Sequence, residues 1–170
     1  MRDNQIISRT ELDLKVGDLG DELTKLCHEY GSGIVFICVM KGGFMFFSDL
    51  IKHIKYPIVV DFIKCSSYEG QEQKMLQLHY DIESDLQDKT VFIVDDILDS
   101  GETMKMLKSH FLAHGAKQIE TVSAVYKENV DFPKHFYIYK QPENVNPWYI
   151  GYGMDDYKGY QRNLDTIHTL

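Results

Sequence analysis

Residues 91–103 read Val-Phe-Ile-Val-Asp-Asp-Ile-Leu-Asp-Ser-Gly-Glu-Thr, and this stretch decides the class of fold. Its first four residues are apolar and largely β-branched, which is typical of a strand buried on both faces of a parallel sheet. Two acidic residues, Asp95 and Asp96, follow this strand. A helix is then predicted over residues 101–114, because its apolar residues fall on one face. A buried strand that turns directly into a helix indicates an α/β domain.

The segments on either side repeat this alternation of strand and helix. The patterns predict helices over residues 16–30 and 44–54 and strands over residues 34–39, 58–63 and 119–126. Residues 66–76 have no clear period, so we expect a loop there. Short strands with proline-containing turns are expected over residues 136–139 and 148–150, where they would form a small cap over the sheet. The alternation predicts βαβ units and a parallel sheet.

Composition and charge narrow the class of protein further. The chain has 170 residues, 44% of them hydrophobic, which is enough for one compact domain. Its 18 Lys and Arg against 26 Asp and Glu give a net charge of −8, which disfavours binding to a nucleic-acid backbone. The sequence has no apolar run of the roughly 18 residues needed for a membrane span, and no signal-peptide core. The three cysteines form no CxxC pair, so we expect reduced thiols in a cytoplasmic protein.

The turn after the strand at residues 91–94 combines groups that suit a phosphorylated sugar. Ligands of parallel α/β folds bind at the carboxyl ends of the strands. A helix N-terminus favours phosphate, and the adjacent carboxylates of Asp95 and Asp96 suit Mg²⁺ or a sugar diol. Taken singly, Asp99 or Ser100 could be a helix N-cap and the two acids a solvated strand end. The spacing fits neither an EF-hand nor a Walker A loop, and a receiver domain would not need the Asp-Ser-Gly-Glu-Thr turn.

Residues 91–103 resemble the phosphoribosyl-pyrophosphate signature of the type I phosphoribosyltransferases, and residues 34–164 resemble their hypoxanthine-guanine branch. The resemblance implies the type I phosphoribosyltransferase fold, a central parallel β-sheet flanked by helices with a small C-terminal hood. Residues 1–170 would form a single domain. Its core would span about residues 15–130, and its hood would comprise about residues 131–170 together with the N-terminal segment.

The resemblance also implies a role for each site residue on the phosphate side. The ribose and 5-phosphate would be bound by the loop after the strand at residues 91–94, namely Asp95, Asp96, Asp99, Ser100, Gly101, Glu102 and Thr103. Asp99 would in addition be the catalytic base. The pyrophosphate would be bound by Lys41, Gly42 and Arg162, with a non-proline cis peptide at the lysine.

On the purine side, the resemblance implies base binding by Lys127, Trp148, Tyr149 and Asp155. Lys127 would donate to the 6-oxygen, and Trp148, where the family usually has phenylalanine, would stack on the base. Asp155 would be the carboxylate linked to a second metal ion, although Asp156 also fits the spacing. Ser67 and Tyr68 would belong to a lid that closes over the site.

The implied activity is Mg²⁺-dependent transfer of 5-phosphoribosyl to hypoxanthine or guanine, in purine salvage, giving IMP or GMP and pyrophosphate. Asp95, Asp96 and Asp155 would be the metal-linked carboxylates. Alternatives are a xanthine-preferring or adenine transferase, or a non-catalytic regulator that senses phosphoribosyl pyrophosphate. The family is usually dimeric or tetrameric, so a homodimer or homotetramer is expected. His110 and His114 lie four residues apart on one predicted helix face, but without a third ligand they do not indicate a zinc site.

Overall fold

The computed structural model describes residues 4–69, 74–127, 132 and 135–170, with the backbone alone for residues 67–69 and 74–76. Its main feature is a six-stranded sheet with the strand order β4-β3-β2-β5-β6-β7. The strands are β2 (Ile34–Met40), β3 (Val59–Glu69), β4 (Lys74–Tyr80), β5 (Thr90–Leu98), β6 (Gln118–Tyr126) and β7 (Phe136–Lys140). Only the pairing of β3 with β4 is antiparallel among the pairs of this described sheet.

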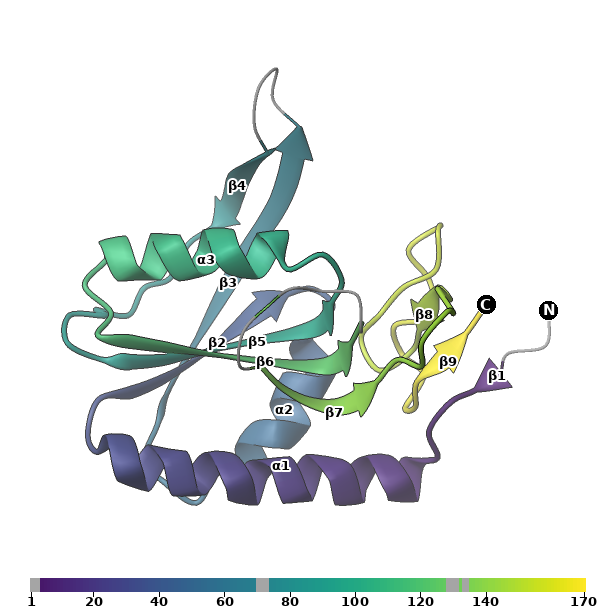
Figure 1. Cartoon of the computed structure of the whole chain (residues 1–170), viewed down its shortest axis with the longest axis horizontal. Coiled ribbons are helices and arrows are strands. Elements are labelled where there is room, and N and C mark those ends of the chain that lie inside the picture. Colours follow the sequence, from purple (N-terminus) through teal and green to yellow (C-terminus); the bar gives the residue numbers. More distant parts are fainter. Residues whose placement is uncertain (1–3, 70–73, 128–131, 133–134) are drawn as a thin grey trace.

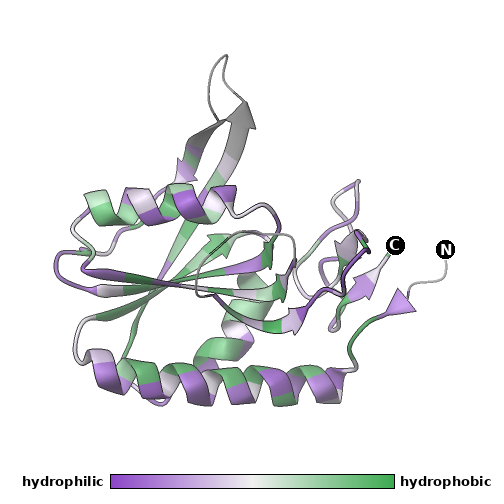
Figure 2. Cartoon of the chain, in the orientation of Figure 1, coloured by the Kyte–Doolittle hydropathy of each residue, from purple (hydrophilic) through white to green (hydrophobic). Residues whose placement is uncertain are grey.

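Three helices cover the two faces of this sheet (Figure 1). Helices α1 (Arg9–Tyr30) and α2 (Phe44–His53) pack on one face, and α3 (Glu102–Ala113) packs on the other. The central strands β2 and β5 are therefore buried on both sides, and Figure 2 shows hydrophobic residues concentrated in the middle of the sheet. The predicted α/β class and its mostly parallel sheet are confirmed.

A second, three-stranded sheet stands at one end of the main sheet. This sheet and the turns of residues 151–167 together are called the hood below. The three-stranded sheet has the order β1-β9-β8 and consists of β1 (Asn4–Gln5), β8 (Tyr149–Ile150) and β9 (His168–Thr169). Because β1 pairs with β9, the two ends of the described chain lie next to each other (Figure 1). The hood faces the carboxyl ends of the parallel strands, which is the edge where a ligand is expected.

Two sequence predictions about strands were wrong. Residues 66–76 were expected to be a loop, but β3 continues to Glu69 and pairs with β4 as an antiparallel hairpin. A hairpin at a sheet edge does not need the apolar run of a central strand, so its polar sequence gave no signal. Residues 136–139 were expected in the cap, but β7 pairs in parallel with β6 and extends the main sheet.

Helix α1 begins seven residues before its predicted start. Ser8 is its N-cap, and the Ser8 hydroxyl accepts a hydrogen bond from the backbone N–H of Glu11. Ser8 and Glu11 have the spacing of a capping box, which the apolar periodicity alone did not detect. Among the described residues, no helix is long and apolar enough to cross a membrane.

Candidate active site

The site begins where β2 and β5 end side by side. Cys38 of β2 pairs with Val94 of β5, so the loop after Met40 lies against the carboxylates that follow Val94. The peptide bond between Met40 and Lys41 is cis. A Cβ atom at Gly42 would overlap the Asp96 carboxylate, which explains why glycine is needed there. The parallel register thus joins two loops that are more than fifty residues apart in the chain.

Asp95 and Asp96 lie inside the last part of β5 rather than beyond it. Each accepts a hydrogen bond from the following backbone N–H, at 2.8 Å from Asp96 and at 2.8 Å from Ile97. Burial, followed by the charge of the Asp96 carboxylate, raises the pKa of Asp95 well above its usual range. Two carboxylates in such an environment are stabilised by a cation or by hydroxyl donors.

The turn into α3 forms a small concave site next to these carboxylates. Gly101 is the helix N-cap with a φ of 76°, a left-handed conformation that glycine adopts without strain. The Ser100 hydroxyl accepts from the backbone N–H of Glu102 at 3.4 Å. The turn encloses a cavity of about 60 Å³, which is lined by Asp95, Ile97, Leu98, Asp99, Ser100, Gly101, Thr103 and Met104. The backbone N–H groups and dipole of a helix N-terminus suit a phosphate there.

A larger cavity of about 180 Å³ adjoins the first and lies between the main sheet and the hood. It is lined by Asp96, Ile97, Asp99, Lys127, Pro147, Trp148, Tyr149, Met154 and Asp155. Of the predicted purine-side residues, all four therefore face one cavity. The two cavities share Ile97 and Asp99, so they adjoin at the end of β5.

Lys127 is the only predicted purine-side residue whose charge is largely enclosed, with its side chain 16% exposed. Its ammonium group lies 2.9 Å from Asp99 Oδ1 and donates to Asn146 Oδ1 at 3.1 Å. The lysine is placed by a backbone hydrogen bond from its own N–H to the Leu98 carbonyl. Because an ammonium group has three donors, these two partners among the described residues leave one donor for a ligand in the cavity.

The hood side of the cavity is held together by one arginine and one tryptophan. Arg162 donates to the Gly153 carbonyl at 2.6 Å and pairs with Asp155 Oδ2 at 2.6 Å. The Trp148 ring N–H donates to the Asp155 carbonyl at 2.7 Å, while the residue as a whole remains 44% exposed. These contacts hold the Trp148 ring and the Asp155 carboxylate at the same cavity wall.

Asp156 has a different environment from Asp155. Its carboxylate accepts hydrogen bonds from the backbone N–H groups of Lys158 and Tyr160, at 2.8 and 2.9 Å. These bonds, with that of the Tyr160 N–H the largest influence, lower the pKa of Asp156. Asp156 therefore stabilises its own turn, and Asp155 is the carboxylate that lines the cavity.

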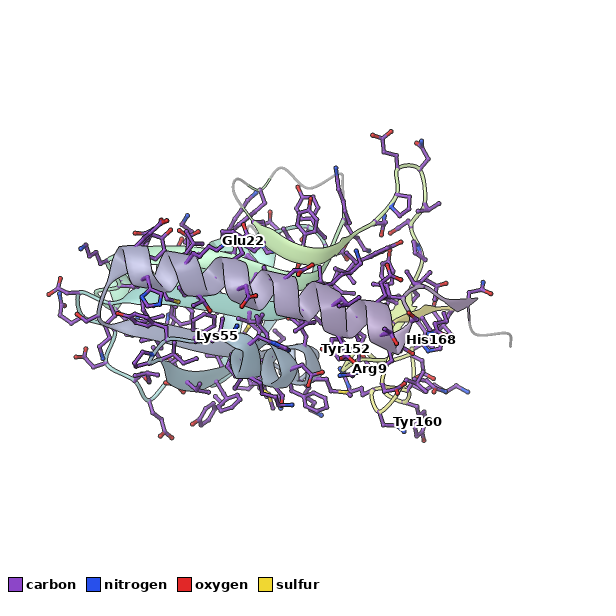
Figure 3. All side chains as sticks on the ribbon, turned by 90° about the horizontal axis from the view of Figure 1, so that it is seen from below. Arg9, Glu22, Lys55, Tyr152, Tyr160 and His168 are labelled. Carbon is purple, nitrogen blue, oxygen red and sulfur yellow. The ribbon has the colours of Figure 1, made fainter. Side chains whose placement is uncertain are left out.

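The hood is anchored to the helical layer by a group of residues that the sequence did not reveal. Tyr152 is fully buried, and its hydroxyl donates to Asp49 Oδ2 at 2.9 Å. Arg9 donates to the same oxygen at 3.0 Å and lies over the Tyr152 ring (Figure 3). Burial by itself would raise the pKa of Asp49, but hydrogen bonds from Lys52, Tyr152 and Arg9 lower it. A Cβ atom at Gly153 would overlap the Gly42 carbonyl, so the residue after Tyr152 packs directly against the loop after β2.

The remaining predicted residues belong to the β3–β4 hairpin. The backbones of Ser67 and Tyr68 pair with Leu76 and Met75. The side chains of Ser67 and Tyr68 lie outside the described part of the structure, and their expected role in a lid stays a prediction. Asn146, Pro147 and Met154 line or support the purine-side cavity but were not anticipated, because no local motif marks them.

Comparison with known proteins agrees with this geometry. Residues 11–156 match the family model of the phosphoribosyl transferase domain. The chain is 34% identical over 159 residues to a hypoxanthine-guanine phosphoribosyltransferase of Staphylococcus aureus, covering 90% of this chain and 85% of the relative. It is 28% identical to a hypoxanthine phosphoribosyltransferase of Salmonella typhimurium, covering 92% and 89%.

Solved structures lead to the same group of proteins. A hypoxanthine phosphoribosyltransferase from Staphylococcus aureus superposes with a TM-score of 0.87 at 31% identity, over 98% of this chain and 90% of that one. A hypoxanthine-guanine phosphoribosyltransferase from Bacillus anthracis gives a TM-score of 0.82 at 34% identity, over 98% and 96%. The similarity therefore extends across both the main sheet and the hood.

Proposed function

The chain belongs to the phosphoribosyltransferase family, and from this premise we propose that it transfers the 5-phosphoribosyl group of phosphoribosyl pyrophosphate to hypoxanthine or guanine. A bond forms between the ribose carbon C1 and a nitrogen of the purine five-membered ring. The bond from C1 to the pyrophosphate oxygen breaks, and pyrophosphate leaves. The products are IMP or GMP, as expected for purine salvage.

The proposed placement of the sugar phosphate uses the smaller cavity and the strand tip. The 5-phosphate would accept hydrogen bonds from backbone N–H groups at the start of α3 and from the hydroxyls of Ser100 and Thr103, with Gly101 and Glu102 completing the turn. The ribose hydroxyls would donate to Asp95 and Asp96. The shared border of the two cavities supports this placement, because C1 would then lie between the phosphate and the base.

The purine would occupy the larger cavity. Trp148 would stack on its face, and the backbone of Tyr149 would meet its edge. The third N–H of Lys127 would donate to the 6-oxygen of hypoxanthine or guanine. Adenine presents an amino donor at this position and would leave the ammonium group unpaired, which disfavours adenine as a substrate.

Asp99 would act as the base for the purine N–H. Its Oδ1 is paired with Lys127, and its second oxygen is available to accept the proton or hydrogen bond. As the proton leaves the ring N–H for Asp99, the electron pair of that bond stays on the purine, and the attacking nitrogen gains electron density for bond formation. The position of Asp99 in both cavities is the single observation that carries this assignment.

The leaving pyrophosphate would be held by Lys41, the backbone of Gly42 and Arg162. Arg162 uses two of its donors on Gly153 and Asp155 and retains others for phosphate oxygens. The donor set of Asp95, Asp96 and Asp155 consists of carboxylate oxygens, which fits Mg²⁺. When bound, Mg²⁺ would offset the negative charge that develops on the pyrophosphate.

We propose a homodimer or homotetramer as the assembly. Strand β3 leaves Val59, Val60 and Phe62 about two-fifths exposed, at 44%, 39% and 40%. Val60 and Phe62 are two positions apart and share one face of the strand, and exposed side chains of this size are suited to contact with a second copy of the chain. Light scattering coupled to size exclusion would measure the mass in solution.

The function is tested by a spectrophotometric assay of the purified protein with phosphoribosyl pyrophosphate and Mg²⁺. Hypoxanthine, guanine, xanthine and adenine are offered in parallel, and we expect turnover of the first two. Asp99→Asn should lower kcat roughly 100- to 10,000-fold, the range for loss of a general base. Asp85→Asn, which changes an exposed loop carboxylate elsewhere, should leave kcat unchanged.

Three results of this assay would each contradict one part of the proposed function. A preference for xanthine would support the xanthine-type transferase. Binding of phosphoribosyl pyrophosphate without turnover of any base would support a regulator. Full activity of Asp99→Asn would remove Asp99 as the base while leaving the transferase assignment in place.

A further inference from the structure

Three side chains that commonly bind metal ions meet at the C-terminal end of α3, outside the candidate active site. His110 and His114 are one helical turn apart, and Asp81 follows the end of β4. One potential ligand atom of each residue lies within 4.8 Å of the other two. Asp81 is 29 residues from His110 in the chain, which is why the sequence pattern of the two histidines lacked a third ligand.

The hydrogen bonds of this cluster place His110 beside the carboxylate and leave one ring nitrogen of His114 ready for a metal ion. His110 Nε2 lies 3.0 Å from Asp81 Oδ1, and a metal ion between these two atoms would displace the proton that they share. His114 Nδ1 lies 2.8 Å from the carbonyl oxygen of His110, and because that oxygen only accepts, Nδ1 carries the proton. The lone pair of His114 is then on Nε2. A histidine that donates from one ring nitrogen to a backbone carbonyl and binds metal with the other is a common arrangement in metalloproteins.

The spacing and exposure of the three groups also fit one small ion. Ligand atoms at about 2.0–2.2 Å from a tetrahedral zinc ion are roughly 3.3–3.6 Å apart, so only small side-chain movements are needed here. The His110 side chain is 18% exposed and the Asp81 side chain 40%, while His114 lies at the surface. Three protein ligands on a surface leave the fourth position open to water.

We propose that Asp81, His110 and His114 form a binding site for a divalent transition-metal ion, with zinc as the best match. Two imidazole nitrogens and one carboxylate suit Zn²⁺, whereas Mg²⁺ prefers oxygen ligands alone. The site is therefore chemically distinct from the carboxylates at the tip of β5. It also lies at the other end of α3, roughly 18 Å along a helix of 12 residues.

A metal ion at this position would connect α3 to the end of β4. Asp81 belongs to the segment leaving the β3–β4 hairpin, and α3 packs against that side of the sheet (Figure 1). Because an ion that binds only the folded chain stabilises it by mass action, zinc should raise the melting temperature. This inference does not depend on which purine the enzyme uses.

The test is a zinc titration of the untagged, full-length protein in excess Mg²⁺, followed by calorimetry and by thermal unfolding. Wild type should bind one zinc ion and melt at a higher temperature with it. His114→Gln removes an exposed ligand at a helical position and should weaken this binding roughly 10- to 100-fold or more, the range found when even an outer-shell partner of a metal is lost. Asp81→Asn should weaken it as well.

His79→Gln is the matched control, since His79 is an exposed histidine of β4 that bonds to Ser66. It should bind zinc as wild type does. Equal zinc affinity in wild type and His114→Gln, or a wild type that binds no zinc under these conditions, would overturn the proposal. Replacing zinc with Co²⁺ adds a direct readout, because four-coordinate Co²⁺ gives a strong visible absorption band that His114→Gln should lose.

Discussion

The candidate site has a strand-tip half, Lys41–Gly43 with Asp95–Thr103, and a hood half, Trp148–Arg162. The two halves meet at one cavity, which Asp96 and Asp99 line on one side and Trp148 and Asp155 on the other, but they are held by different forces. The strand-tip half continues two strands that are buried on both faces, so main-chain pairing and core packing position it. The hood half has two paired residues of β8, one bridge between Gly151 and Met154, and otherwise turns. Besides a few main-chain hydrogen bonds, its geometry depends on side-chain hydrogen bonds from Arg162, Trp148 and Tyr152.

This difference has a consequence for how each half responds to substitution. A change in the strand-tip half cannot be relaxed by movement of the backbone, because the interior beneath it is closely packed. A substitution in the hood half removes one side-chain hydrogen bond among several, and the main chain of the turns can then adjust. We therefore expect strand-tip substitutions to lower kcat and hood substitutions mainly to weaken substrate binding.

Gly42→Ala should have the largest effect of the substitutions that test this contrast. Its Cβ atom would overlap the Asp96 carboxylate, so either that carboxylate or the loop must move. A displacement of about 1 Å at a catalytic group can reduce the rate roughly 100-fold, and we expect a loss of kcat of at least that size. Steady-state kinetics at saturating substrates would measure it.

Gly17→Ala provides the matched control for this glycine. A Cβ atom at Gly17 would make only ordinary contact with the His53 ring. Alanine in α1 should leave kcat unchanged and stabilise the fold by up to about 1 kcal/mol through helix propensity. If Gly42→Ala retained wild-type kcat, the strand-tip half would be more adaptable than the packing indicates.

Arg162→Ala tests the hood half. It removes the hydrogen bond to Gly153 and the ion pair with Asp155. Hydrogen bonds to charged groups contribute about 1.5–3 kcal/mol, so we expect the KM for phosphoribosyl pyrophosphate to rise roughly 10- to 100-fold. The value of kcat should change less, and Lys158→Ala on the same exposed turn should change neither. A loss confined to kcat would place Arg162 with the strand-tip half.

The two halves also differ in how far they could be predicted from sequence. Asp95 to Thr103 are nearly contiguous and follow a strand with an unmistakable apolar pattern, so the β5–α3 junction could be inferred locally. Phosphate binding by this turn stays a prediction. The hood residues come from several turns, and counting could not decide between Asp155 and Asp156. Only the fold places the Asp155 carboxylate on the cavity wall.

Contacts between residues far apart in the chain determine the remaining features of the site and its surroundings, and a single sequence holds no local signal for such contacts. The anchor of Arg9, Asp49 and Tyr152 joins three segments that are 40 and 103 residues apart. The same holds for the pairing of Lys127 with Asn146 and for the meeting of Asp81 with His110. In each case ordinary surface-type residues acquire a role because distant elements pack together.

Tyr152→Phe should show that the hood anchor contributes to stability more than to catalysis. The variant loses the hydroxyl donor to Asp49, while Arg9 and Lys52 continue to bind that carboxylate. We expect a decrease of about 1–2 kcal/mol in the free energy of unfolding and a kcat within about twofold of wild type. Denaturant unfolding would measure the first. Tyr160→Phe, which removes a hydroxyl from a side chain that is 68% exposed, should leave stability unchanged.

Trp148→Phe should have the smallest effect, because it preserves the property that the hood half is proposed to supply. The variant loses the ring N–H that donates to the Asp155 carbonyl at 2.7 Å, but a phenyl ring can still stack on the purine. We expect a rise of about two- to fivefold in the KM for hypoxanthine, consistent with loss of one neutral hydrogen bond of about 0.5–1 kcal/mol. Trp148→Ala removes the stacking surface as well and should raise this KM further. The additional rise should correspond to a loss of roughly 1–3 kcal/mol of stacking free energy. If Trp148→Phe instead lowered kcat as strongly as Gly42→Ala, the indole would be holding Asp155 in place for the reaction, and the hood would be as rigid a part of the site as the strand tip.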